Sequence, residues 1–261
     1  MIEHTKVAGV SVLAVTPRER TRPPVLFVHG YFVDASVWTM WLEFFAARGI
    51  PAFAVNLRGR AGSPTSDLGR ASIDDFVEDA SAVARHIGAP AVVGHSMGGL
   101  IAQKLAERDE VSAGVLLTPA PPRGIKVLSP RVAMLQLKYM PAILLSRVVR
   151  PAPEDLRELV LNRIPANQQE TLLAAMIPDS GRAGRDMSIT GFPVDATRVR
   201  CPLLVIAAEH DHFIRPRVVE RVARRYGAPF EVARGHGHML IAEPGWDALA
   251  DRVERWIGEH S

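Results

Sequence analysis

The sequence predicts an α/β fold in which a mostly parallel sheet is covered by helices on both faces. Short runs such as Val25–Val28 and Leu203–Ala208 are apolar at every position, which is typical of strands buried on both faces. Segments with apolar residues at helical spacing separate these runs, and strands joined through helices lie parallel in one sheet. With 261 residues the chain is long enough to bury a substantial core.

Composition limits the classes of partner and compartment. Basic residues exceed acidic ones by only three, and the arginines are spread along the chain, so nucleic acid is not an expected partner. Cys201 is the only cysteine, which excludes an internal disulfide, and because it precedes Pro202 and an apolar strand we expect it to be buried. The sequence has no signal-peptide pattern and no apolar run of the ~20 residues that span a bilayer, so we expect a cytoplasmic protein.

The first part of the chain supplies most of the predicted sheet. We expect an edge strand or hairpin at residues 7–15 and buried strands near 24–28, 52–56, 90–93 and 114–118. Helices are expected after Asp34, after Ser72 and from Met97 to Glu107. Ser72 and Asp75 form a capping-box pattern, and Gly88 is a typical helix stop. The tryptophans after Asp34 are predicted to lie in the core.

The alternation of strand and helix returns near the C-terminus. Leu203–Ala208 is predicted to be a buried strand, Pro216 begins a helix that ends at Tyr226–Gly227, and a last strand is expected at residues 229–233. A final helix is predicted to start at Pro244.

Between these parts the pattern changes. We expect residues 1–119 and 201–261 to form one α/β core and residues 120–200 to form a helical cap insertion, with helices near 132–149, 154–162 and 168–176 and no buried strand. The apolar residues of the first helix are expected to be mostly core: Met134, Leu135, Met140, Leu144 and Leu145. Alternatively, methionines of this segment face a pocket that takes a pliable apolar ligand.

One stretch carries most of the chemistry. Residues 90–102 combine an apolar strand, the pattern Gly94-His95-Ser96-Met97-Gly98 and the start of a helix of small residues. This pattern is typical of a nucleophile elbow, in which a serine on a strained turn projects its hydroxyl from the sheet. The flanking glycines are required because a side chain there would collide with the neighbouring strand or helix.

A serine hydroxyl needs a base within hydrogen-bond reach and a third group that orients this base. Ser96 follows one strand, Asp211 follows the strand at 203–208 and His238 follows the last strand. The order Ser, Asp, His along the chain is that of the α/β-hydrolase arrangement. We expect His238 to take the serine proton and Asp211 to hold its imidazole. The backbone N–H groups of Tyr31 and Met97 are the expected oxyanion donors.

These residues resemble the α/β-hydrolase superfamily, in particular its capped, esterase-like branch. Five pieces in the order of the chain carry the resemblance: His29-Gly30-Tyr31-Phe32, the stretch from Asn56 to Ser63, Gly94–Gly99, Asp211 and Gly237-His238. The resemblance implies the α/β-hydrolase fold, a Ser-Asp-His triad and a cap after the sixth core strand. Two positions depart from it: Asn56 stands where many members have aspartate, and Ala208 where many have glycine.

Rival assignments exist for the base, for the acid and for the type of site. His236 could be the base in place of His238, but the resemblance favours His238 because the apolar residues Met239–Ile241 follow it. Glu209 could be the acid in place of Asp211. Asp211 lies further into the loop, where the family places its acid. Four histidines near these positions could instead suggest a metal site: His210, His212, His236 and His238. That interpretation leaves the elbow unexplained, so neither a metal nor a cofactor is expected.

The function expected from these residues is hydrolysis of an ester, lactone or thioester of a largely apolar small molecule. The same scaffold could also carry C–C bond hydrolysis, lyase chemistry or acyl transfer on a bulky metabolite. A ligand receptor with a vestigial triad is the alternative from another class, and the presence of Ser96, Asp211 and His238 argues against it.

Overall fold

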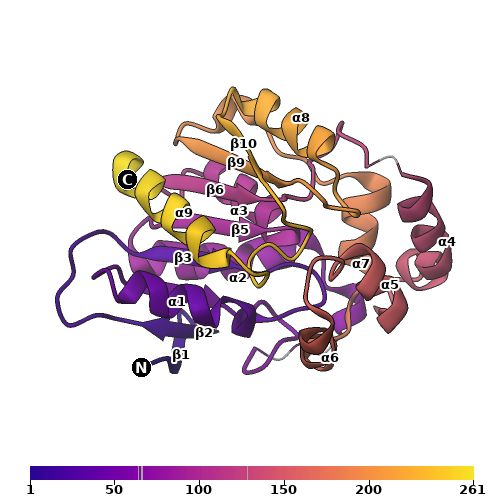
Figure 1. Ribbon diagram of the computed structural model, residues 1–261, viewed down its shortest axis with the longest axis horizontal. Helices are drawn as coiled ribbons and strands as arrows, with labels where there is room; N and C mark the ends of the chain where they lie inside the picture. The colour runs from indigo at the N-terminus through magenta and orange to yellow at the C-terminus, as the bar shows by residue number, and fades with distance from the viewer. Residues whose placement is uncertain (64, 66, 128) are drawn as a thin grey trace.

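A central β-sheet organises the molecule. The computed structural model describes residues 1–63, 65, 67–127 and 129–261 (Figure 1). In them the sheet strands are β1 (Glu3–Val7), β2 (Val10–Val15), β3 (Val25–Val28), β4 (Ala52–Val55), β5 (Ala91–His95), β6 (Ala113–Leu117), β9 (Leu203–Ala208) and β10 (Phe230–Ala233). The spatial order is β1-β2-β4-β3-β5-β6-β9-β10. β2 pairs antiparallel with β1 and β4, and the other neighbours are parallel, so the predicted fold class is confirmed.

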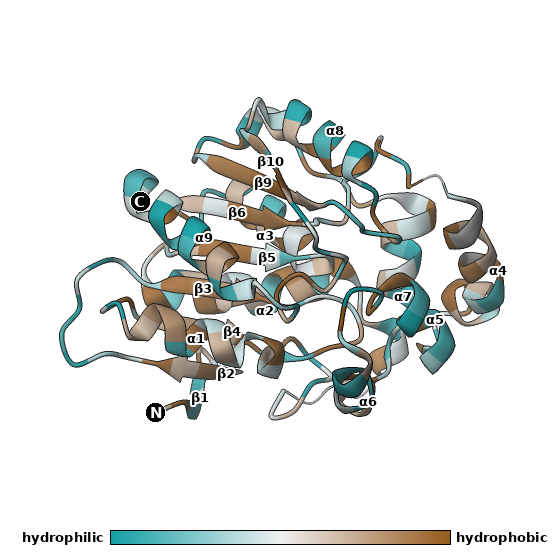
Figure 2. Ribbon diagram, in the orientation of Figure 1, coloured by the Kyte–Doolittle hydropathy of each residue, from teal (hydrophilic) through white to brown (hydrophobic). Residues whose placement is uncertain are grey.

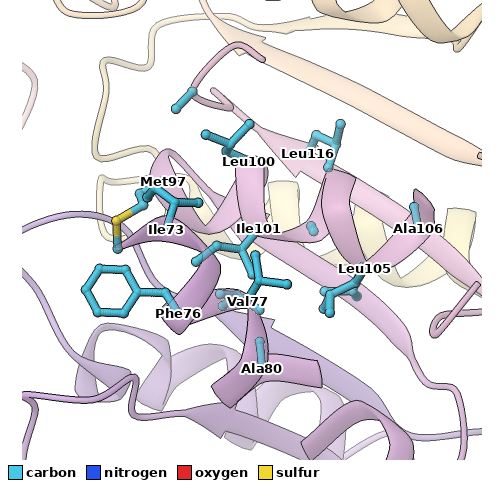
Figure 3. Packing of buried hydrophobic residues seen from close by; sticks show 14 of the residues in the cluster. Ile73, Phe76, Val77, Ala80, Met97, Leu100, Ile101, Leu105, Ala106 and Leu116 are labelled. Atoms are coloured by element: carbon cyan, nitrogen blue, oxygen red, sulfur yellow. The ribbon is translucent and has the colours of Figure 1, made fainter. Parts of the chain in front are cut away.

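Helices cover both faces of this sheet. α1 (Thr39–Ala46) and α9 (Trp246–His260) lie on one face, and α2 (Ile73–Ile87), α3 (Met97–Glu107) and α8 (Pro216–Tyr226) pack on the other. Figure 2 shows the strands between them as largely hydrophobic. Trp38 and Trp41 are fully buried against Phe27 of β3, as predicted. Figure 3 shows the contact of α2 with α3, where Val77 and Ile101 belong to the same apolar cluster.

Local signals set the ends of these helices. The side chains of Ser72 and Asp75 form the predicted capping box at the start of α2, and Gly88 ends the helix with φ +89°. The predicted start of the last helix is wrong by two residues. α9 begins at Trp246, because Gly245 takes a left-handed conformation that the helix cannot include.

The segment between β6 and β9, residues 120–200, is named here the inserted segment. It contains α4 (Pro130–Leu144), α5 (Pro153–Leu159), α6 (Ala166–Ala175) and α7 (Gly181–Arg185), which lie at one end of the sheet (Figure 1). Two short strands, β7 (Val148–Val149) and β8 (Asp179–Ser180), pair antiparallel within it. Short turns of 3-10 or π helix complete the chain at Ala35–Trp38, Leu68–Arg70, Asp186–Thr190 and Ala196–Arg198.

Three expectations for this segment are wrong. Residues 120–200 were expected to contain no buried strand, whereas both residues of β8 are buried. The helix predicted to reach residue 149 ends at Leu144, because Ser146 has a positive φ of 51°, and the residues after it form β7. A strand of two residues is too short to give a pattern in the sequence. Met134, Leu144 and Leu145, expected in the core, are exposed. Outside the segment, Cys201 is half-buried rather than buried, and burial raises the pKa of its thiol to about 11.

The turn between β5 and α3 has almost no free space. Ser96 has φ +54° and ψ −116°, a backbone conformation that is strained for a residue with a side chain. A Cβ on Gly94 would lie 2.3 Å from the carbonyl oxygen of Gly98, and a Cβ on Gly98 would lie 2.1 Å from that of Val28. Glycine at both positions is therefore a steric requirement of the turn.

Two histidines are fully enclosed at the same edge of the sheet. His29 follows β3 and His95 ends β5. Burial, more than any charge, lowers the pKa of each to about 3. Both imidazoles are therefore neutral in the folded protein near neutral pH.

Replacement of Gly98 by Ala tests the steric requirement. We expect Gly98→Ala to lower the free energy of unfolding by about 3 kcal/mol or more, because the new methyl group meets backbone atoms that cannot move aside. Gly88→Ala is the control, since no atom lies within 4 Å of its Cβ and only the left-handed backbone opposes it, at a cost of about 1–2 kcal/mol. Equal losses for the two variants in urea unfolding would contradict the close packing of the turn.

The buried histidines predict acid sensitivity. Below pH 6.5 the unfolded chain protonates both imidazoles while the folded protein does not until about pH 3, so stability decreases as the pH falls through this window. Each histidine contributes about 1.4 kcal/mol per pH unit to the slope. We expect His95→Gln to flatten the dependence of the unfolding free energy on pH by about this amount between pH 4 and 6. An unchanged slope in urea titrations would contradict neutral burial of His95.

Candidate active site

The carboxyl ends of four strands bring the predicted site residues together. Ser96 directly follows β5, Asp211 lies in the loop after β9, and His238 lies in the loop after β10. Tyr31 follows β3, which is the hydrogen-bonded neighbour of β5. Ligands of parallel sheets bind at this edge. Residues that are far apart in the sequence thus form one site.

Ser96, His238 and Asp211 form a continuous chain of hydrogen bonds. His238 Nε2 lies 3.1 Å from Ser96 Oγ, and His238 Nδ1 lies 2.8 Å from Asp211 Oδ2. Since a carboxylate only accepts, Nδ1 carries the ring proton and Nε2 is left as the acceptor for the serine hydroxyl. All three side chains are buried. The rivals His236 and Glu209 are not part of this chain.

Backbone groups hold the Asp211 carboxylate in place. Its Oδ1 accepts the N–H groups of Phe213 at 2.7 Å and Ile214 at 2.8 Å, which leaves Oδ2 for His238. Glu209 instead accepts the N–H of Gly235 at 2.8 Å and stays at the surface. The geometry therefore separates the two candidate acids.

Two residues that the sequence did not single out hold the His238 loop. His95 is neutral, and its Nε2 donates to the His238 carbonyl oxygen at 2.8 Å. Glu243 is almost completely buried and accepts the N–H of Gly237 at 2.7 Å, with His236 Nδ1 at 3.2 Å from the same oxygen. His236 thus contacts Glu243, which also binds the backbone of the His238 loop. The position of His95 beside Ser96 in the elbow was the available signal for its role.

The backbone around Ser96 offers unpaired donors. Met97 is the first residue of α3, where N–H groups have no partner within the helix. Neither its N–H nor that of Tyr31 makes a hydrogen bond to a residue that the structure describes. Tyr31 and Ser96 line the same cavity. Both predicted donor groups therefore remain available beside the serine.

The inserted segment fastens the loop that contains Tyr31. Phe32 N–H donates to Asp179 Oδ2 at 2.9 Å, and the Phe32 carbonyl accepts Ile177 N–H at 2.9 Å. The Tyr31 hydroxyl donates to the Ser180 carbonyl at 2.5 Å. Burial, with the Asp179 charge as the second cause, raises the pKa of Tyr31 well above its ordinary value, so this hydroxyl stays protonated. These three hydrogen bonds hold the Tyr31–Phe32 loop in one conformation.

Asp179 is itself held by a buried ion pair. Its carboxylate pairs with the guanidinium of Arg60, and both side chains are fully inaccessible to solvent. Burial raises the pKa of the Asp179 carboxyl, and the Arg60 charge and two backbone N–H groups act in the opposite direction. These residues are 119 positions apart, and no spacing in the sequence indicated their contact.

A cavity of about 590 Å³ opens on the serine. Volumes of this order are typical of sites for small organic molecules. The sequence offered the alternative that methionines of the inserted segment face a pocket. Three of them do line this cavity: Met140, Met176 and Met187. Apolar residues from α4 and α5 form much of the remaining wall: Val132, Leu135, Ile143, Leu156 and Leu159.

The alternative of a metal site has no geometric support. His212 Nδ1 lies 3.1 Å from the Glu158 carbonyl oxygen, His236 contacts Glu243, and His238 contacts Asp211. In the part of the chain that the structure describes, no group of three or more His, Cys, Asp or Glu side chains is arranged to hold an ion. Within the same residues, no helix is both long and apolar enough to cross a membrane.

Comparison with known proteins gives the family. Residues 25–252 match the alpha/beta hydrolase family. The chain is similar to a monoacylglycerol lipase of Mycolicibacterium smegmatis, with 28% identity over 97% of this chain and 95% of the relative. It is also similar to epoxide hydrolase 3 of Xenopus tropicalis, with 25% identity over 90% of this chain and 71% of the relative.

Solved structures share the fold at lower identity. The monoacylglycerol lipase of Paleococcus ferrophilus superposes with a TM-score of 0.73 at 20% identity, over 96% of this chain and 99% of that structure. The family match covers most of the chain and includes the elbow, Asp211 and His238. The chain therefore belongs to the alpha/beta hydrolase family and is an enzyme of that family.

Proposed function

We propose that this enzyme hydrolyses an ester of a largely apolar small molecule through an acyl-enzyme on Ser96. The observation that carries the proposal is the hydrogen-bonded chain Ser96–His238–Asp211, which opens on an apolar cavity. The similar monoacylglycerol lipases also support an ester as the substrate.

In the first half of the reaction, Ser96 Oγ attacks the ester carbonyl while His238 Nε2 takes the hydroxyl proton. Asp211 stabilises the imidazolium that forms. The negative charge on the carbonyl oxygen is stabilised by the N–H groups of Tyr31 and Met97, and a donor of this kind typically contributes about 3 kcal/mol. When the C–O bond breaks, His238 returns the proton to the leaving alcohol.

In the second half of the reaction, a water molecule takes the place of Ser96 Oγ as the attacking group. His238 removes a proton from the water as it attacks the acyl carbon, and the same two N–H groups stabilise the second oxyanion. The acyl–Oγ bond then breaks, Ser96 recovers its proton from His238, and the carboxylic acid leaves. Each proton that His238 takes is returned within the same half-reaction.

The nucleophile favours carbonyl substrates over epoxides. Opening of an epoxide by Ser96 Oγ would leave an ether between the serine and the substrate, and an ether has no carbonyl carbon for water to attack. An acyl-serine has a carbonyl carbon that water can attack. Lactones and thioesters react by the same acyl transfer and belong to the same proposal.

We also propose that the inserted segment is the cap of the active site. It supplies α4 and α5 to the cavity wall, and its residues Ile177, Asp179 and Ser180 fasten the Tyr31–Phe32 loop. The segment thus contributes to the volume that a substrate fills and to the position of the oxyanion donor.

Substitution of Ser96 and Asp211 tests the mechanism. We expect Ser96→Ala to abolish hydrolysis of short aryl esters and to prevent labelling by a fluorophosphonate, with the adduct located by mass spectrometry. Asp211→Asn should lower kcat by about 10⁴-fold with little change in KM, because it favours the wrong imidazole tautomer. Glu209→Gln is the matched control and should leave kcat nearly unchanged. Loss of activity in Glu209→Gln together with an active Asp211→Asn would overturn the choice of acid.

The proposed positioning of Tyr31 by the inserted segment gives a further prediction. Asp179→Asn keeps the size of the side chain but removes the charge that Arg60 faces, so the Tyr31–Phe32 loop loses its fixed position. We expect kcat to fall by about 10- to 100-fold with a much smaller change in KM, because misplacement of about 1 Å has effects of this size. The rate of fluorophosphonate labelling should fall in parallel.

A matched control separates positioning from general stability. Asp186 is also a buried carboxylate of the inserted segment, and it accepts the N–H of Ile73 at 3.3 Å and pairs with Arg182. Among the residues that the structure describes, it makes no hydrogen bond to the Tyr31–Phe32 loop. Asp186→Asn should therefore lower the melting temperature but not kcat. Equal kcat losses in the two variants would contradict a positioning role for Asp179.

A further inference from the structure

Helix α4 is apolar on two opposite sides. Its inner side faces the cavity with Val132 and Ile143. On its outer side, Met134 and Leu137 keep 67% and 70% of their area exposed. Leu144 and Leu145 at its end keep 53% and 59%. Four large apolar side chains exposed on one side and at the end of the same helix form an apolar surface that a partner would cover.

The stretch that contains α4 is rich in basic residues, of which Lys138 is paired with Asp155 of α5. Between Glu110 and Glu154 the sequence contains no acidic residue and six basic ones: Arg123, Lys126, Arg131, Lys138, Arg147 and Arg150. The whole chain has a net charge of only +3. Arg147 and Arg150 are exposed and follow Leu145 closely in the chain, and neither makes an ion pair with the residues described. These charges favour a partner that is both apolar and negatively charged.

We propose that the outer side of α4 binds the surface of an anionic lipid bilayer. Exposed apolar side chains flanked by basic residues are typical of helices that lie in the interface of a membrane. Negative lipid headgroups attract such basic residues, while the apolar side chains enter the acyl region. A second copy of this chain fits poorly, because a symmetric contact through α4 would bring two basic segments face to face.

The same helix links the bilayer to the cavity. Leu135 and Met140 lie on the cavity wall, so the bilayer and the bound substrate would contact opposite sides of α4. An apolar ester could then pass from the bilayer to Ser96 with little exposure to water. This consequence rests on the proposed ester hydrolysis, whereas binding to the bilayer does not.

Binding is tested with the full-length Ser96→Ala protein, so that hydrolysis does not change the vesicles. We expect it to sediment with vesicles of phosphatidylcholine and phosphatidylglycerol in equal amounts, to bind pure phosphatidylcholine at least about tenfold more weakly, and to be released by 0.5 M salt. Equal binding to both kinds of vesicle, or no binding to either, would overturn the proposal.

Surface variants locate the contact. Leu144→Glu/Leu145→Glu and Arg147→Gln/Arg150→Gln should each weaken binding about tenfold or more. Met40→Glu, at a partly exposed apolar residue of α1, and Arg18→Gln/Arg20→Gln are the matched controls and should bind like the parent protein. Circular dichroism verifies that each variant is folded. Equal loss in the controls, or a dimer in sedimentation that Leu137→Glu dissociates, would contradict the proposal.

An activity measurement separates this proposal from the proposed function. With active enzyme, Leu144→Glu/Leu145→Glu should lower the hydrolysis of a long-chain ester embedded in anionic vesicles about tenfold and leave a water-soluble short ester unaffected. Absence of turnover on every ester would refute ester hydrolysis but not the vesicle binding of the Ser96→Ala protein. Equal losses on both substrates would show that the variant damages the site and would refute delivery from the bilayer.

Discussion

The absence of space at the turn after β5 is the constraint on which the site depends. Ser96 can take its strained backbone conformation only because Gly94 and Gly98 allow α3 to approach the strands directly. Gly98 lies against the carbonyl of Val28, so the same contact fixes the end of β3 relative to the serine. Tyr31 follows β3 within three residues of that contact. This close packing thus places the proposed nucleophile and the proposed oxyanion donor together, before any side-chain interaction is made.

The parts of the fold that were predictable are those with a local cause. Buried parallel strands and capped helices leave patterns within ten to fifteen residues, and these predicted the sheet, the capping box of α2 and the elbow. The expected contact of Asp211 with His238 rested on the order of strands along the chain and on the family resemblance, and the two side chains do meet. The Arg60–Asp179 pair and the support of His238 by Glu243 arise from the way the loops meet in three dimensions. Neither has a periodicity or a spacing that a sequence could display.

The errors in the inserted segment have a physical origin as well. Apolar residues at helical spacing predict a buried face, and this prediction assumes that the protein itself supplies the cover. Leu135 and Met140 obey it because the cavity lies on their side of α4, whereas Met134 and Leu144 face solvent in the isolated chain. A sequence pattern records that a face is apolar. It does not record whether the chain, a substrate or a membrane covers it.

The two proposed roles of the inserted segment are mechanically connected. The chain leaves α4 at Leu144 and enters β7 four residues later, and Val149 of β7 pairs with Asp179 of β8. The Arg147 carbonyl also accepts the N–H of Gly181, beside the same strand. The helix that would meet a bilayer is therefore joined, through one short strand pair, to the carboxylate that fastens the Tyr31–Phe32 loop beside Ser96.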